Sequence, residues 1–117
     1  MTEASSGKSL LVVVASDPRT SHRPAEAIRL AAGLAAWRNV AVTLFFTGVA
    51  TAAVSTDCED FVDEESYTRY LPLFVESSGR VYVESSGAKL NAELAHEKVS
   101  REQFAALASK VTYLLRF

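Results

Sequence analysis

Three polar side chains follow the short apolar run 80–83 ("RVYV"): Glu84, Ser85 and Ser86, before Gly87. The run is typical of a buried strand, and ligands of parallel α/β sheets bind beyond the carboxyl ends of the strands. A carboxylate in a closed pocket there has a pKa raised by desolvation and acts as a base or ligand anchor. The simpler interpretation is that Glu84 leaves the sheet edge and is held by water or a backbone N–H. The sequence is compatible with both interpretations of Glu84.

Two other loops are expected at the same edge of the sheet. One follows the apolar run 9–16 and reads "DPRTSHRP", and the other begins at Thr47 after the run 40–46. The first leads into a predicted helix, whose free backbone N–H groups favour an anion. Helix capping and solvation are the simpler explanation for its polar side chains. The candidate ligand-binding residues are Asp17, Arg19, Ser21, His22, Thr47, Gly48, Glu84, Ser85 and Ser86.

Cys58 is the only cysteine of the chain and, with Glu84, one of two weak catalytic candidates. It lies between Asp57 and Glu59 in the stretch 57–65, where six of nine residues are acidic. Nearby negative charge raises the pKa of a thiol and lowers its thiolate fraction. We therefore expect a structural or incidental cysteine rather than a reactive one.

Metal and hydrolase chemistry are not indicated. His22 and His96 are the only histidines, and they repeat no ligand spacing. The acidic stretch 57–65 lacks the alternating ligands and turn glycine of a calcium loop, so it reads as a solvated face. The segment "ESSG" is not the G-x-S-x-G elbow of a serine hydrolase. We predict no metal and no cofactor.

Composition narrows the class of protein. The chain has 117 residues, of which 49% are apolar and 22% charged, as expected for one globular domain. A net charge of −2 with scattered basic residues does not favour nucleic acid as a partner. No run of 18 apolar residues predicts a membrane span, and residues 1–9 lack the apolar run of a signal peptide. The expected compartment is the cytoplasm.

The apolar patterns predict an α/β domain over residues 9–117 after a disordered tail, 1–8. Four buried strands joined by helical crossovers require a mostly parallel sheet with helices on both faces. Pro72 should kink or divide the third helix, and Trp37 is expected in the core rather than at a subunit interface. The strands are predicted at 9–16, 40–46, 80–83 and 110–117, and the helices at 24–38, 48–55, 66–77, 87–98 and 100–108.

The order of these segments resembles the DsrE/DsrF-like family of small sulfur-relay proteins. The resemblance extends from about Ser9 to Phe117, and its most specific parts are "VTLFFTGVATAAV" and the C-terminal helix that leads into "KVTYLLRF". It implies a three-layer sandwich and a homo-oligomer, whether dimer, trimer or hexamer. In active members it also implies a cysteine that carries a persulfide between proteins.

This chain departs from that family at the cysteine. Aligning the elements puts the position of the family cysteine on Glu84, or on Ser85 with a one-residue slip, and neither side chain is a thiol. A persulfide relay needs a thiolate that is both nucleophile and leaving group. We therefore expect a non-catalytic DsrE-like module that binds a small anionic ligand or a partner protein. The alternative is a relay protein that uses Cys58 or the thiol of a partner sulfur-relay protein.

Overall fold

The computed structural model describes residues 8–37, 40–54, 60–84 and 97–117. Within these ranges five parallel strands form one sheet in the order β5-β4-β3-β2-β6. The strands are β2 (Lys8–Val14), β3 (Val40–Phe46), β4 (Arg80–Glu84), β5 (Glu97–Val99) and β6 (Tyr113–Arg116). Helical crossovers join β2 to β3 and β5 to β6, as the parallel arrangement requires.

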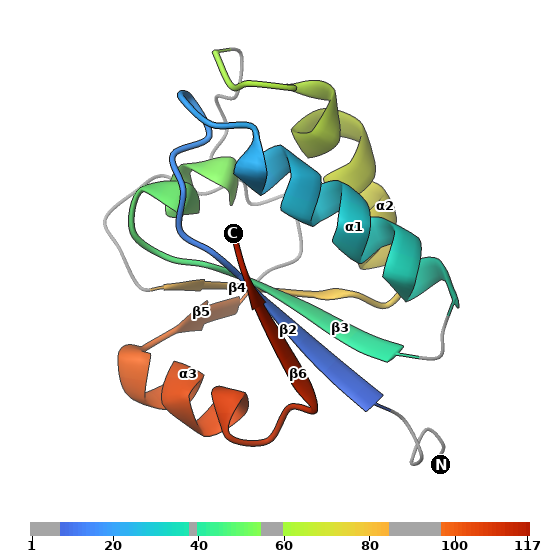
Figure 1. Ribbon diagram of the computed structural model, residues 1–117, viewed down its shortest axis with the longest axis vertical. Coiled ribbons are helices and arrows are strands. Elements are labelled where there is room, and N and C mark those ends of the chain that lie inside the picture. The colour runs from blue at the N-terminus through green and yellow to red at the C-terminus, as the bar shows by residue number, and fades with distance from the viewer. Residues whose placement is uncertain (1–7, 38–39, 55–59, 85–96) are drawn as a thin grey trace.

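Helices cover both faces of this sheet, so the predicted three-layer α/β architecture is confirmed (Figure 1). One face carries α1 (Arg23–Trp37) and α2 (Leu71–Glu76), and the opposite face carries α3 (Arg101–Ala108). A 3-10 helix, Gly48–Val54, follows β3 on the side of α1. No helix among the described residues is long and apolar enough to cross a lipid bilayer.

Side chains along each strand point alternately to the two faces of the sheet, so the core has two parts of unequal size. Toward α1 and α2, the strands bury Leu10, Val12 and Val14 of β2 with their neighbours in β3 and β4. Toward α3, the smaller core contains Leu11, Val13, Phe45, Tyr82 and Val99. Because α3 has only eight residues, it covers less of its face than α1 and α2 cover of theirs.

The C-terminal half differs from the sequence prediction at two strands. Residues 97 and 98, predicted as the end of a helix over 87–98, belong to β5, and 87–96 lie outside the described residues. The last strand is shorter than predicted and exposed along its whole length rather than buried. Its position at the edge of the sheet explains this, because only β2 pairs with it.

The helix predictions have mixed outcomes. Pro72 divides the predicted helix 66–77 into a π-helical turn, Ser66–Tyr70, and α2, where the proline sits in the first turn. Ser100 caps α3 as predicted. Trp37 was wrongly predicted in the core, because 70% of it is exposed at the end of α1. The predicted tail 1–8 overlaps β2 at Lys8, and its other residues lie outside the described ranges.

Candidate functional site

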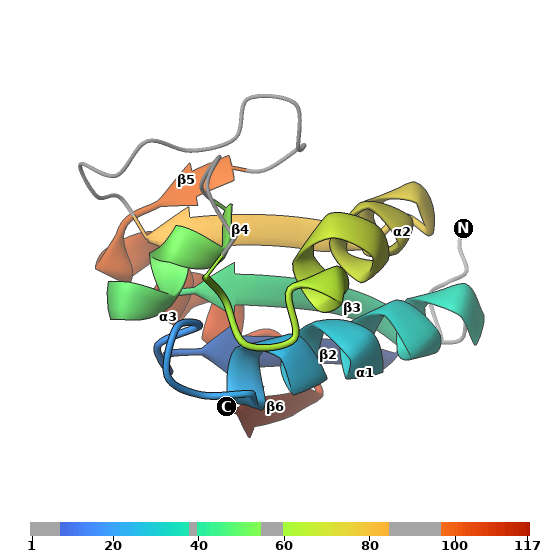
Figure 2. The ribbon, with the colours of Figure 1, turned by 90° about the horizontal axis from the view of Figure 1, so that it is seen from above.

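The register of the sheet brings Thr47 and Glu84 together. Phe46 pairs with Val83, so the next residue on each strand, Thr47 and Glu84, stands at the same level where β3 and β4 end. Figure 2 shows the arrowheads of β3, β4 and β5 at one edge of the sheet. Tyr82 faces α3, and by alternation Glu84 extends to the same side.

The carboxylate of Glu84 accepts three hydrogen bonds, and its side chain is only 20% exposed. Its Oε1 accepts from Thr47 Oγ1 at 2.7 Å and from the backbone N–H of Gly48 at 3.1 Å. Its Oε2 accepts from Arg101 Nε at 3.1 Å. Gly48 has a φ of +60°, a conformation that suits glycine and turns this N–H toward the carboxylate.

These donors lower the pKa of Glu84 below its ordinary value. The hydrogen bond from Thr47 contributes most, followed by the N–H of Gly48 and the guanidinium of Arg101, while partial burial opposes them. The interpretation of Glu84 as a carboxylate with a raised pKa is therefore wrong, because its pKa is lowered. Glu84 is therefore ionised at neutral pH, and the simpler interpretation, in which a backbone N–H holds it, describes it better.

Arg101 is placed by the start of α3. Ser100 and Gln103 form a capping box, in which each side chain accepts a hydrogen bond from the backbone N–H of the other residue, at 3.1 and 2.8 Å. This box fixes the first turn of α3 after β5, whose Val99 pairs with Glu84. The Arg101 side chain is 91% exposed, so its ion pair with Glu84 lies at the rim of the site.

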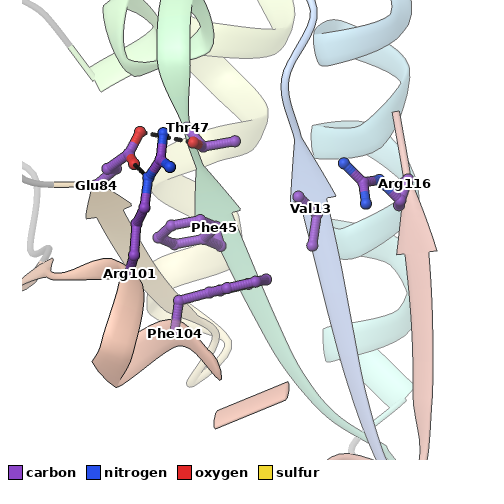
Figure 3. A pocket seen from close by; sticks show the side chains of 7 residues that line it. All are labelled: Val13, Phe45, Thr47, Glu84, Arg101, Phe104 and Arg116. Carbon is purple, nitrogen blue, oxygen red and sulfur yellow. Dashed lines mark hydrogen bonds and ion pairs between the residues drawn. The ribbon is translucent and has the colours of Figure 1, made fainter. Parts of the chain in front are cut away.

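A cavity of about 250 Å³ lies beside this cluster, between the sheet and α3. Phe45 and Phe104 form its apolar wall, with ring centroids 4.3 Å apart and planes 21° from parallel. Figure 3 shows Glu84, Thr47 and Arg101 on one side and Arg116 on the other. The lining residues are Val13, Phe45, Thr47, Glu84, Arg101, Phe104 and Arg116.

Arg116 reaches the cavity because β6 pairs with β2 at the sheet edge. Its register partner is Val13, whose side chain faces α3, so Arg116 extends to the same side. The following residue fixes the strand end, since the N–H of Phe117 donates to the carbonyl of Val13 at 2.8 Å. The described residues give the Arg116 guanidinium no hydrogen bond and no ion pair.

The loop after β2 does not line the cavity. Asp17 Oδ1 accepts from the backbone N–H of Arg19 at 2.9 Å, and the Arg19 side chain pairs with Asp60 at 3.1 Å. Ser21 Oγ accepts from the N–H of Arg23, at the first residue of α1, at 3.1 Å. His22 pairs with Glu26 one turn along α1. These side chains shape the loop and the start of α1.

The structure thus joins three of the predicted residues, Thr47, Gly48 and Glu84, and separates the loop residues from them. Arg101, Phe104 and Arg116 were missed by the sequence reasoning, because their positions depend on how α3 and β6 return across the sheet. Cys58, Ser85, Ser86 and His96 lie outside the described residues. Within the described ranges no group of three or more His, Cys, Asp or Glu side chains is arranged to hold a metal ion.

Comparisons with known proteins bear on the fold. No protein-family model matches the sequence, and no curated protein matches it. Among solved structures, the crystal structure of the ychN protein from E. coli superposes with a TM-score of 0.73 at 16% identity. The match covers 94% of this chain and 99% of that one, and YchN has a DsrE-like fold. The chain therefore has the DsrE-like α/β fold.

Proposed function

We propose that this chain is a non-catalytic binding module that takes a small anionic ligand, or a partner protein, at the carboxyl edge of its sheet. The observation that supports this proposal most is the ionisation state of the Glu84 side chain. Its three donors hold it as a carboxylate, and proton transfer to it is disfavoured because its pKa is lowered. In this proposal, Glu84 orients Thr47, the Gly48 turn and Arg101 around the adjacent cavity. We expect the protein in the cytoplasm.

The charges of the cavity support an anion rather than a cation. Two guanidinium groups line it against one carboxylate, and the carboxylate is already paired with Arg101. Arg116 is the remaining positive group on the wall. An anion that enters the cavity can accept charge-assisted hydrogen bonds from this guanidinium, beside the apolar wall.

The alternative proposal is a sulfur relay through Cys58 or through a partner's thiol. The described lining residues include no thiol, so a relay at this cavity would need sulfur from another segment or another protein. The protein can be treated with a persulfide donor and its intact mass measured before and after reduction. The binding module predicts no reducible gain of sulfur on the folded protein. A stoichiometric gain at Cys58 under native conditions would overturn it in favour of the relay.

We also propose that the module assembles as a homo-oligomer, and β6 is the surface that supports this. Tyr113, Leu114 and Leu115 are each at least 41% exposed on a strand whose outer edge has no partner among the described strands. An exposed apolar edge strand is a template for pairing with another chain. A second copy of β6 presents the matching edge. Pairing of β6 with its own copy joins chains two at a time, as in a dimer or in a hexamer built of dimers, and the oligomer is expected to cover these side chains.

A further inference from the structure

We propose that the preferred ligand of the cavity is a small aromatic monocarboxylate, with its ring on the Phe45 and Phe104 wall and its carboxylate on Arg116. This inference rests on the proposed binding function and narrows it to a chemical class. Three features of the cavity carry it: the distribution of charge, the apolar wall and the volume.

The charged side chains that line the cavity favour a ligand with a single negative charge. Arg101 is paired with Glu84 through Nε, and Glu84 also accepts hydrogen bonds from Thr47 and Gly48. The guanidinium of Arg116 has no such partner among the described residues and presents a planar fork that matches a carboxylate. A dianion would place its second charge in the same cavity as the Glu84 carboxylate, where like charges repel.

The apolar wall between these charged side chains favours a ligand with a flat, apolar ring. Val13, Phe45 and Phe104 separate Glu84 from Arg116, and they offer no hydrogen-bonding side chain (Figure 3). The two phenyl rings are already stacked, so a third ring can extend the stack or meet its edge. A small hydrophilic anion would leave this surface in contact with water.

The volume limits the ligand to about one ring. An apolar cavity of about 150 Å³ is sufficient for benzene. The cavity beside Glu84 measures about 250 Å³, which adds room for a carboxylate and a short linker. Drug-sized ligands occupy pockets of roughly 300 to 1,000 Å³, so they would protrude.

The test is calorimetric titration of the full chain at pH 7 with four probes: benzoate, acetate, phenylphosphonate and benzamide. We expect benzoate to bind with a dissociation constant at or below about 1 mM and at least about tenfold more tightly than the others. The Arg116→Gln variant should lose about tenfold in benzoate affinity. Arg29→Gln, which removes an exposed arginine of α1, is the matched control and should lose nothing. Phe104→Leu should lose about three- to tenfold with the guanidinium intact.

The outcomes separate this inference from the function it rests on. Equal binding of acetate and benzoate would overturn the choice of an aromatic body while an anion site remained. Tighter binding of phenylphosphonate would overturn the choice of a monoanion in the same way. Equal loss in Arg116→Gln and Arg29→Gln would show that benzoate binds elsewhere and would overturn the assignment. If neither acetate, benzoate nor phenylphosphonate bound, the small-anion function would fall together with the inference.

Discussion

Thr47 Oγ1 lies 2.7 Å from Glu84 Oε1, although the two residues are 37 positions apart in the chain. This contact ties the end of β3 to the end of β4 and gives Glu84 the strongest of the donors that lower its pKa. The carboxylate is thereby a structural part of the edge that borders the cavity. Three segments contribute one donor each to Glu84: the residue after β3 a hydroxyl, the following turn an N–H, and α3 a guanidinium.

Replacing Thr47 with Val tests the contact directly. The variant keeps the shape of the side chain but removes the hydroxyl donor, so we expect a loss of about 1 to 2 kcal/mol in the free energy of unfolding. Thr20→Val, at an exposed turn residue, should change it by less than about 0.5 kcal/mol. Urea denaturation measures both. Equal effects of the two variants would show that the hydroxyl of Thr47 does not stabilise Glu84.

The lowered pKa of Glu84 predicts how stability depends on pH. Its pKa in the folded chain lies below the usual glutamate value of about 4.3, so its ionised form stabilises the fold above that pH. This stabilisation is lost as the pH falls through the folded-state pKa. The difference in free energy of unfolding between wild type and Glu84→Gln should therefore be constant from about pH 6 to 8 and shrink below about pH 4. A difference that grows toward acid would indicate a raised pKa instead.

Gly48 and Gly33 form a matched pair of glycines. The φ of +60° at Gly48 opposes a side chain, so Gly48→Ala should destabilise the fold by about 1 to 2 kcal/mol. Gly33 lies exposed within α1 with open space around it, so Gly33→Ala should stabilise it by about 0.5 to 1 kcal/mol. Thermal unfolding of the two variants should move the melting temperature in opposite directions. A neutral Gly48→Ala would mean that the turn does not need a left-handed residue.

The exposed side chains of β6 predict a change in assembly. Leu115→Lys places a charge on the edge strand, so we expect it to dissociate the oligomer while the monomer stays folded. Leu73→Lys alters a similarly exposed leucine on α2 and serves as the control, with assembly unchanged. Light scattering after size-exclusion chromatography measures both masses, with circular dichroism to check folding. A wild-type protein that is monomeric at all concentrations would contradict assembly through β6.

Local signals in the sequence were sufficient for most of the fold. The β-branched runs of β2, β3 and β4, the proline in the first turn of α2 and the cap at Ser100 each act over a few residues, and all appear in the structure. The strand β5 was missed because it has only three residues, two of them charged and exposed, after a stretch of helix-forming composition. The exposure of β6 depends on its position at the sheet edge, which no local pattern encodes.

The candidate site was predicted as far as the strand ends define it. The rule that ligands bind at the carboxyl ends of parallel strands located Thr47, Gly48 and Glu84. It gave the loop of Asp17 and Arg19 equal weight, although Asp17 accepts a hydrogen bond within the loop and Arg19 is paired with Asp60. Arg101 and Arg116 reach the cavity only through the return of the chain across the opposite face, so their neighbours in the sequence carry no sign of it.

We propose that the edge formed by Thr47, Gly48, Glu84, Arg101 and Arg116 is an anion-binding site. A titration of the nitrogen-15-labelled protein with benzoate, followed by amide chemical shifts, tests it most directly. We expect saturable shifts at the amides of Gly48, Arg101, Phe104 and Arg116, and we expect the Arg116→Gln variant to lose them. Shifts confined to the loop 17–22 at the start of α1, with the cavity amides unmoved, would contradict it.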